Sequence, residues 1–203
     1  MKHRNLVVIS AGLSQPSSTR LLADQLSAAA VSAAGDLGIV LDTRVIELRD
    51  LAHDITNNLL TGFPAAALRD ALDAVAAADA VIAVTPIFTA SYSGLFKSFV
   101  DILDKDALAG KPVVVAATAG TARHSLALEH ALRPLFAYLR ATVIPTAVFA
   151  AADDWGAESA DGDLRSRIER AAGELARELD HREPAAPADP FALPESFEDL
   201  LKR

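Results

Sequence analysis

The sequence predicts an α/β fold in which helices cover both faces of a doubly wound, five-stranded parallel sheet. Apolar runs of strand length alternate along the chain with longer stretches of helical spacing, which is typical of parallel α/β proteins. Apolar residues make up 51% of the 203 residues and charged residues 23%, enough to fill a substantial core. The chain is longer than the roughly 150 residues of one average domain but too short for two full cores. We therefore expect one domain over residues 1–181, followed by an arm over residues 182–203.

Five segments have the composition of strands. The first, third and fourth are unbroken runs rich in Val, Ile and Ala, as expected of strands that helices cover on both faces. The second alternates between apolar and polar residues and therefore indicates a half-exposed strand at the sheet edge. The segments cover residues 6–10, 39–48, 80–85, 112–118 and 142–148.

Five segments between and after these strands have helical spacing. A hydroxyl of Ser17, Ser18 or Thr19 can cap the first, and Pro64 suits the first turn of the second. Pro134 lies inside the fourth, where we expect a kink or a break. The helices are expected at about residues 20–33, 64–76, 94–103, 125–139 and 164–179. This set of strands and helices matches a flavodoxin-like sheet, in which ligands bind where loops leave the carboxyl ends of the strands.

The end of the chain and the third helix bear on assembly. Four of the chain's ten prolines fall in residues 182–203, so we expect an extended Pro-rich arm. The Phe and Leu residues of this arm are too apolar for a free tail. The arm is therefore expected to pack either on its own domain or on another subunit. The helix at 94–103 carries apolar residues around most of its circumference, which predicts a homodimer or homotetramer. These residues are Leu95, Phe96, Phe99 and Val100.

Composition and charge exclude several classes of function. A net charge of -8 and a pI near 5.0 repel nucleic acid and anionic membranes, and no apolar run approaches the ~18 residues of a membrane span. The chain has no cysteine, which excludes disulfides, thiolate nucleophiles and cysteinyl metal sites and fits a cytoplasmic protein. The five histidines form no metal-binding motif, and Ser91–Gly94 lacks the first glycine of a serine hydrolase. We expect no metal and no obligatory catalytic side chain.

The first loop, residues 10–20, joins a buried strand to a helix start. Its hydroxyl groups, a close approach at Gly12 and the free N–H groups of the helix N-terminus suggest a site for a single phosphate. The patterns of a dinucleotide-binding loop and of a P-loop are absent. An ordinary polar loop with a helix cap is the alternative.

The second loop, residues 85–97, and the third, residues 118–124, follow two neighbouring strands. In the second, Phe88 and Tyr92 could flank a planar ligand or simply pack onto neighbouring helices. In the third, Gly120 lets the backbone approach a ligand ring, while Arg123 adds positive charge or is a solvated residue. The three loops converge on one crevice with a phosphate cradle, a pocket for a planar ring and a polar rim, which describes a site for flavin mononucleotide (FMN).

Two motifs extend this interpretation. The first is the stretch T-P-I-F-T-A-S-Y-S-G at residues 85–94, which is followed by Leu95, Lys97 and Asp101. The second is the stretch A-G-T at residues 119–121, which is followed by a helix from His124 to Pro134. Over residues 6–154 the chain resembles the NADPH-dependent FMN reductase family of flavodoxin-like proteins, particularly the flavin reductases of two-component monooxygenases. The resemblance implies hydride transfer from NADPH or NADH to FMN and supply of reduced FMN to an FMNH2-dependent monooxygenase.

The resemblance also implies which residues bind the cofactor. The FMN phosphate would be held by Ser10, Ser14, Ser17, Ser18 and Thr19. The ribityl chain and ring would be held by Pro86, Ile87, Phe88, Thr89 and Tyr92, and the far edge of the ring by Thr118, Ala119, Gly120 and Thr121. Phe88 stands where the family often has tyrosine, and the first loop lacks the common G-S-x-R, so the resemblance assigns no role to Arg20.

Three further expectations concern turnover. Arg20 and Arg123 are the candidates for contacting a phosphate of the pyridine nucleotide. A quinone or azo-compound reductase with bound FMN is an alternative activity. A non-enzymatic electron carrier of flavodoxin type is an alternative from a different class, because it shares the fold and the cofactor.

Overall fold

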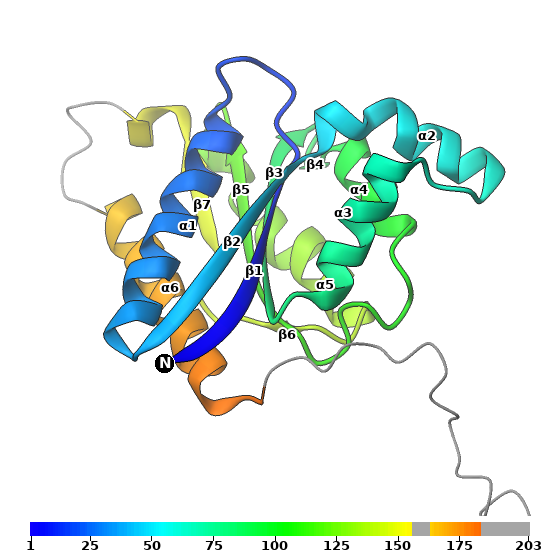
Figure 1. The fold of residues 1–203 in the computed structure, drawn as a ribbon. Coiled ribbons are helices and arrows are strands. Elements are labelled where there is room, and N and C mark those ends of the chain that lie inside the picture. The colour runs from blue at the N-terminus through cyan, green and yellow to red at the C-terminus, as the bar shows by residue number, and fades with distance from the viewer. Residues whose placement is uncertain (156–162, 184–203) are drawn as a thin grey trace, which may run out of the picture.

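The computed structural model describes residues 1–155 and 163–183 and contains one twisted, mainly parallel sheet (Figure 1). The strand order is β2-β1-β3-β5, and β6 and β7 both pair with β5 on its other side. The parallel strands are β1 Lys2–Ser10, β2 Ile39–Glu47, β3 Ala80–Phe88, β5 Pro112–Ala119, β6 Thr142–Val143 and β7 Val148–Ala151. This is the order of a flavodoxin-like sheet, so the predicted fold class is confirmed, including the position of the second strand at an edge.

The fifth strand differs from its prediction. We expected a continuous strand over residues 142–148, but β6 and β7 are separated by residues 144–147. Pro145 lies in this gap, and proline has no N–H to donate to a neighbouring strand. Pairing with β5 resumes at Val148 and continues to Ala151, beyond the predicted end.

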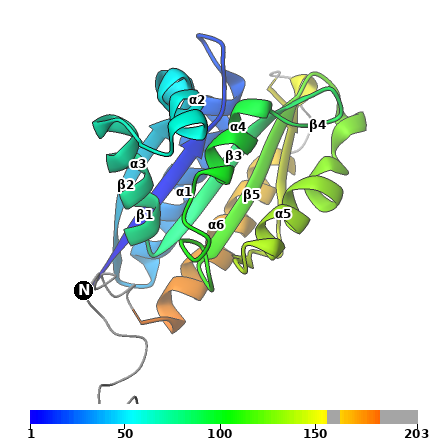
Figure 2. The same cartoon turned by 90° about the vertical axis from the view of Figure 1, so that its right-hand side faces the viewer.

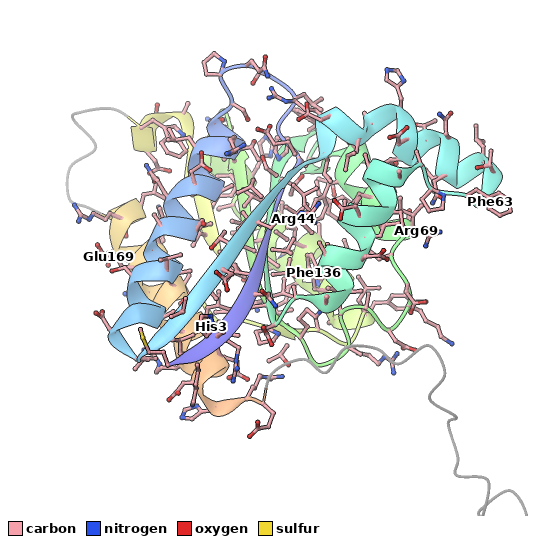
Figure 3. All side chains as sticks on the ribbon, viewed as in Figure 1. His3, Arg44, Phe63, Arg69, Phe136 and Glu169 are labelled. Atoms are coloured by element: carbon pink, nitrogen blue, oxygen red, sulfur yellow. The ribbon has the colours of Figure 1, made fainter. Side chains whose placement is uncertain are left out.

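Helices cover both faces of the sheet (Figure 2). Helices α1 Ser18–Asp36 and α6 Asp163–His181 pack on one face, where Leu22 and Leu175 join a cluster with Leu6 of β1. Helices α3 Ala66–Ala77, α4 Gly94–Asp101 and α5 Arg133–Tyr138 pack on the other face. There Phe136 points into the core (Figure 3) and its ring centroid lies 6.2 Å from that of Phe96.

A helix that we did not predict follows β2. Helix α2, Ala52–Thr61, ends at Gly62, which has a φ of 79° and donates its N–H to the Asn58 carbonyl at 2.8 Å. A glycine at this left-handed position is a common helix end. Gly62 is therefore a stop signal for this helix, and the sequence prediction used only Pro64, as the start of the next helix.

The region around Pro134 is broken, as predicted. A 3₁₀ turn at Ala122–His124 and a π-helical turn at Leu128–Leu132 precede α5, and Pro134 lies in the first turn of α5. Proline is tolerated there because a first-turn N–H has no partner within the helix.

The basis for the predicted oligomer does not hold in α4. Phe96, Phe99 and Val100 are buried within one chain, and Leu95 is half-buried against the same core. The sheet and neighbouring helices therefore cover the apolar surface that we had expected a partner subunit to cover, and an oligomer stays a prediction. The proposed arm lies outside the described residues from position 184 onward. None of the helices in the described ranges is long and apolar enough to cross a membrane.

Candidate functional site

The three loops after β1, β3 and β5 meet at a cleft of about 310 Å³, which we call the carboxyl-edge cleft. It is lined by Leu13, Ser14, Ser17, Ser18, Thr19, Pro86, Ile87, Phe88, Thr118, Ala119 and Gly120. All but Leu13 were predicted site residues. The lining carries hydroxyl, main-chain and apolar groups and no charged side chain.

The first loop is built around the start of α1. The Ser17 hydroxyl caps this helix by accepting from the N–H of Arg20 at 3.2 Å, so Ser17 is the cap among the three predicted candidates. A Cβ at Gly12 would lie 2.0 Å from the Ser17 Oγ, which means that only glycine fits where the loop passes the cap. The N–H groups of Ser18 and Thr19 have no acceptor among the hydrogen bonds of the described residues. They are free donors beside the positive end of the helix dipole.

Two buried hydroxyl groups lie beneath the loop. Thr19 is 2% exposed, and its Oγ1 lies 2.8 Å from the Oγ1 of Thr118, which ties the first loop to the third. Ser10 is fully buried at the end of β1, and its Oγ has no hydrogen-bond partner in the described part of the chain. A buried hydroxyl without a partner is costly, so it is an available contact for a polar ligand.

The second loop is a β-hairpin. Strand β3 continues to Phe88 and pairs antiparallel with β4, Ser91–Tyr92, through the pairs Ile87 with Tyr92 and Phe88 with Ser91. The two residues between them, Thr89 and Ala90, have φ values of 49° and 70°. A positive φ is unfavourable for both residue types and most of all for β-branched threonine. The sequence lacks the Asn-Gly or Asp-Gly signal of such a turn, and we expected a loop here without predicting the hairpin.

The two aromatic residues of this loop have different surroundings. Phe88 lines the cleft and is 47% exposed. Tyr92 is half-buried, and its ring centroid lies 6.0 Å from that of Phe96 in the core. Of the two alternatives left open by the sequence, Phe88 is placed to flank a planar ligand, whereas Tyr92 packs onto a neighbouring helix.

The third loop forms an open side of the cleft. Ala119 is half-buried and Gly120 is exposed, and a Cβ placed on Gly120 would meet nothing within 4 Å. Thr121 and Arg123 lie beyond the cleft lining, and Arg123 is exposed. Thr89 also lies outside the lining, at the tip of the hairpin.

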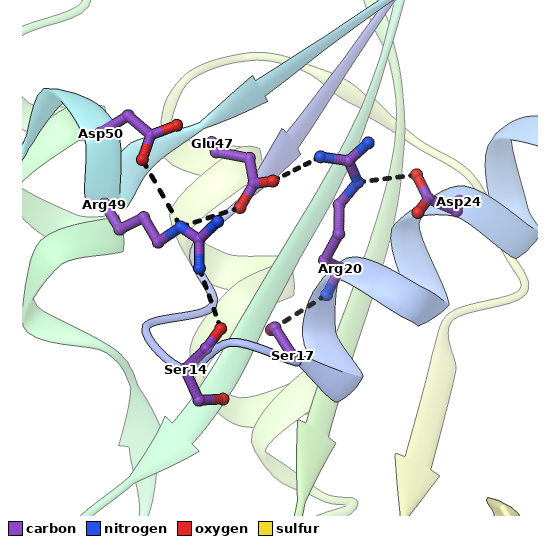
Figure 4. Close-up of polar contacts among 7 residues, drawn as sticks. All are labelled: Ser14, Ser17, Arg20, Asp24, Glu47, Arg49 and Asp50. Atoms are coloured by element: carbon purple, nitrogen blue, oxygen red, sulfur yellow. Dashed lines mark hydrogen bonds and ion pairs between the residues drawn. The ribbon is translucent and has the colours of Figure 1, made fainter.

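Beside the first loop lies a group of charged residues that the sequence did not bring together, which we call the bridging network (Figure 4). It consists of Arg20, Asp24, Glu47, Arg49 and Asp50. Arg20 was a candidate for contacting a nucleotide phosphate, but its guanidinium bonds Asp24 at 2.7 Å and also Glu47. The hydrogen bonds that the Arg20 guanidinium donates to Asp24 and Glu47 raise the pKa of Arg20 above its ordinary value, so this cation is permanently charged and already paired.

Glu47, Arg49 and Leu13 are the residues near the site that our sequence reasoning missed. Glu47 ends β2 and pairs with Ser10 in the strand register, which the sequence alone does not give. Leu13 had a visible signal, because it is an apolar residue in an otherwise serine-rich loop.

Other hollows lie away from the three loops. A larger hollow of about 660 Å³ between α1 and α6 is lined by three alanines, Ile168 and polar or charged residues, and none of the three loops contributes to it. Within residues 1–155 and 163–183, no group of three or more His, Asp or Glu residues could hold a metal ion.

The donors of the carboxyl-edge cleft fit FMN. Free helix N–H groups and serine hydroxyls suit a phosphate, and the unpartnered Ser10 hydroxyl provides a further contact at the end of β1. Pro86, Ile87 and Phe88 provide an apolar wall for a flat ring, and the small residues Ala119 and Gly120 follow Thr118, which pairs with Pro86 in the strand register.

Comparisons with known sequences agree with this fit. The family described as NADPH-dependent FMN reductase matches residues 4–156. An FMN reductase (NADPH) from Pseudomonas aeruginosa is 37% identical over 174 residues, which cover 82% of this chain and 90% of that protein. The NADH-dependent FMN reductase SfnE from Pseudomonas putida is 36% identical over 72% of this chain and 76% of its own length.

Solved structures give the same result. An oxidoreductase from Corynebacterium diphtheriae is 48% identical with a TM-score of 0.86, and the match covers 90% of this chain and all of that one. The apo form of an NADH:FMN oxidoreductase, EmoB, is 31% identical with a TM-score of 0.76, and the match covers 90% of this chain and 98% of that one.

Proposed function

Because the chain belongs to the NADPH-dependent FMN reductase family and is an NAD(P)H-dependent FMN reductase, we propose that it binds FMN in the carboxyl-edge cleft and supplies reduced FMN to a separate monooxygenase. When bound, the flavin ring is the group that accepts a hydride from NADPH or NADH. The protein contributes binding, orientation and exclusion of water.

In this proposal the first loop holds the phosphate. The N–H groups of Ser18 and Thr19 donate to its oxygens, and the hydroxyls of Ser14, Ser17 and Ser18 complete the shell. No charged side chain lines the cleft, so the charge of the phosphate is balanced by the helix N-terminus and by main-chain dipoles.

The second and third loops orient the ring. Pro86, Ile87 and Phe88 form one wall, and the base of the hairpin is fixed because the Thr85 Oγ1 accepts from the Ser93 N–H at 3.1 Å. Thr85 and Ser93 are both buried, so the base of this wall is anchored in the core.

The observation that carries the proposed delivery of reduced FMN is the open side of the cleft. Ala119 and Gly120 leave it uncovered in the described residues, so a nicotinamide has access to the ring and the flavin has a route out. Free reduced flavin is rapidly reoxidised by oxygen, so an enzyme that releases it is useful only beside a reaction that consumes it. Oxygen insertion by an FMNH2-dependent monooxygenase is that class of reaction.

Arg123 is the proposed contact for the pyridine nucleotide. It is exposed in the 3₁₀ turn at the end of the third loop, whereas Arg20 is already paired with two carboxylates. An exposed guanidinium near the open side is suited to a phosphate group of NADPH.

The experiment that tests delivery separates the two enzymes. The reductase with NADPH and FMN is placed on one side of a dialysis membrane and an FMNH2-dependent monooxygenase with its substrate on the other, at low oxygen. We expect hydroxylated product that depends on added FMN. If FMN stays with the protein during gel filtration and no product forms, while quinones are reduced in many turnovers, the chain passes electrons to quinones and the delivery proposal is wrong.

A further inference from the structure

We infer that Glu47 is a positioning residue for binding the flavin phosphate, because its carboxylate joins the two arginines that secure the first loop. The inference rests on the proposed binding of FMN in the carboxyl-edge cleft. Glu47 and the two arginines lie outside the cleft lining, so none of them is expected to contact the flavin directly.

The tip of the first loop depends on Arg49. Residues 13–16 are exposed, and in the described part of the chain their main chain has no bond to the main chain of another element. The Nη1 of Arg49 donates to the Ser14 carbonyl at 3.0 Å. The Gln15 amide is oriented so that its oxygen faces this guanidinium and also accepts from Arg49. In the opposite orientation the amide NH2 group would face the N–H groups of Arg49, and no hydrogen bond could form. Arg49 therefore connects the loop tip to the end of β2.

The other end of the loop depends on Arg20. The main-chain N–H of Arg20 donates to the Ser17 hydroxyl that caps α1, and its side chain turns back toward β2. The guanidinium of Arg49 therefore holds the tip of the first loop, and the main chain of Arg20 holds the end of the loop where α1 begins (Figure 4).

Glu47 joins the two arginines. Its Oε1 accepts from the Nη1 of Arg20, and its Oε2 lies 3.2 Å from the Nε of Arg49. The Glu47 side chain is 15% exposed, compared with 49% for Asp24 and 70% for Asp50, which each contact only one of these arginines. The contact of Oε2 with Arg49 is an ion pair without hydrogen-bond geometry, and its low exposure means that water screens it less than the contacts of the two aspartates. Among the described residues of the network, Glu47 is the one that joins the two arginines.

A positioning role explains why a carboxylate lies so near a proposed phosphate site. Glu47 pairs with Ser10 in the strand register, at the first residue of the loop. An unpaired carboxylate at this edge would repel a phosphate, but two guanidinium groups neutralise Glu47. It therefore fixes the shape of the loop without opposing the ligand's charge.

The test compares FMN with riboflavin, which has the same ring and no phosphate. Binding of both flavins is measured by fluorescence quenching in the wild-type chain and in Glu47→Gln. We expect Glu47→Gln to weaken FMN binding about tenfold and to change riboflavin binding less than twofold. Asp24→Asn and Asp50→Asn are matched controls, since each removes a carboxylate from one of the same arginines, and both are expected to change FMN binding less than twofold.

Three outcomes would overturn the inference: unchanged FMN binding in Glu47→Gln, equal loss of FMN and riboflavin, or an equal loss in the two aspartate variants. If Glu47→Gln does not fold, Arg49→Gln serves instead, with the same expected selective loss of FMN. A wild-type chain that binds FMN and riboflavin equally would contradict the phosphate site itself. A wild-type preference for FMN that Glu47→Gln retains would contradict only the role of Glu47.

Discussion

The parallel strands begin at one end of the sheet, which we call the amino edge, and finish at the other, which we call the carboxyl edge. The two ends use polar groups in opposite ways. At the amino edge, Lys111 is 9% exposed, and its Nζ donates to the Val75 and Ala76 carbonyls at 2.6 and 2.8 Å, at the end of α3. Arg4 is 4% exposed, and its terminal nitrogens donate to the carbonyls of Arg182 and His3, while its Nε has no hydrogen-bond partner among the described residues. At the carboxyl edge, the N–H groups that begin α1 and the hydroxyl of Ser10 have no partners among the described residues.

This difference separates stability from binding. At the amino edge, Lys111 satisfies the last carbonyls of α3 and the terminal nitrogens of Arg4 satisfy main-chain carbonyls of β1 and of the residue after α6, so these hydrogen bonds are used within the fold. At the carboxyl edge, Ser18 and Thr19 line the cleft and their N–H groups remain for a ligand, while the unpartnered Ser10 hydroxyl is buried beneath the loop. Substitutions at the two edges should therefore affect different measurements.

The largest expected effect is at the amino edge. Lys111→Ala should lower the free energy of unfolding by about 2–3 kcal/mol, because two carbonyls lose their donor and the buried stem leaves a cavity. Urea unfolding measures this change. FMN affinity should stay within twofold of wild type, and a loss of affinity as large as the loss of stability would remove the distinction between the edges.

At the carboxyl edge, Ser18→Ala should weaken FMN binding by about 1.5 kcal/mol, or roughly tenfold, through loss of a charge-assisted hydrogen bond. Its stability should be unchanged, because Ser18 is exposed and does not cap the helix. Ser17→Ala should weaken FMN binding and also cost about 1 kcal/mol of stability, because Ser17 is the cap. Ser32→Ala, on the exposed side of the same helix, is the control, and an equal effect there would argue against a phosphate site.

The pH dependence of stability sharpens the comparison. Burial lowers the pKa of Lys111 from 10.5 to about 8. Between these values the unfolded chain binds a proton that the folded chain has released, so the free energy of unfolding rises as pH increases from 8 to 10.5. The rise should be about 1–2 kcal/mol, reduced by remaining contact with solvent. Lys111→Met should lack this part of the rise, and identical pH profiles for the two chains would contradict the assignment.

The smallest expected effect is in the hairpin. Thr89→Gly should raise the free energy of unfolding by about 0.5–1 kcal/mol, because a positive φ is costly for threonine and not for glycine. Thr121→Gly, at an extended φ of -151°, should lower it instead. Thermal unfolding of the two variants distinguishes relief of strain from a general effect of glycine, and a loss of stability in both would show that the turn is unstrained.

Much of the fold could be predicted because burial on both faces leaves a strong apolar pattern. The runs in β1, β3 and β5 showed it, and the alternation in β2 correctly placed that strand at an edge. Pro145 marks the break between β6 and β7, but the apolar residues on both sides of it have the composition of one continuous strand. Helix α2 was missed because its stop signal, Gly62, lies beside the Pro64 that begins the next element.

The cleft could be predicted more fully than its surroundings. Parallel strands bring their carboxyl ends to one edge, so the three loops had to meet. The bridging network could not be found in this way, because the contact of Glu47 with Arg20 depends on the register of β1 against β2 and on long side chains. The turn at Thr89 and Ala90 was hidden for another reason, since residues that disfavour a positive φ adopt it there.

The most direct test is a crystal structure of the chain with FMN. Our account predicts the phosphate within hydrogen-bond distance of the N–H groups of Ser18 and Thr19, and the ring between Phe88 and Gly120. Density for the flavin in the hollow between α1 and α6, or a phosphate that contacts neither residue, would contradict it.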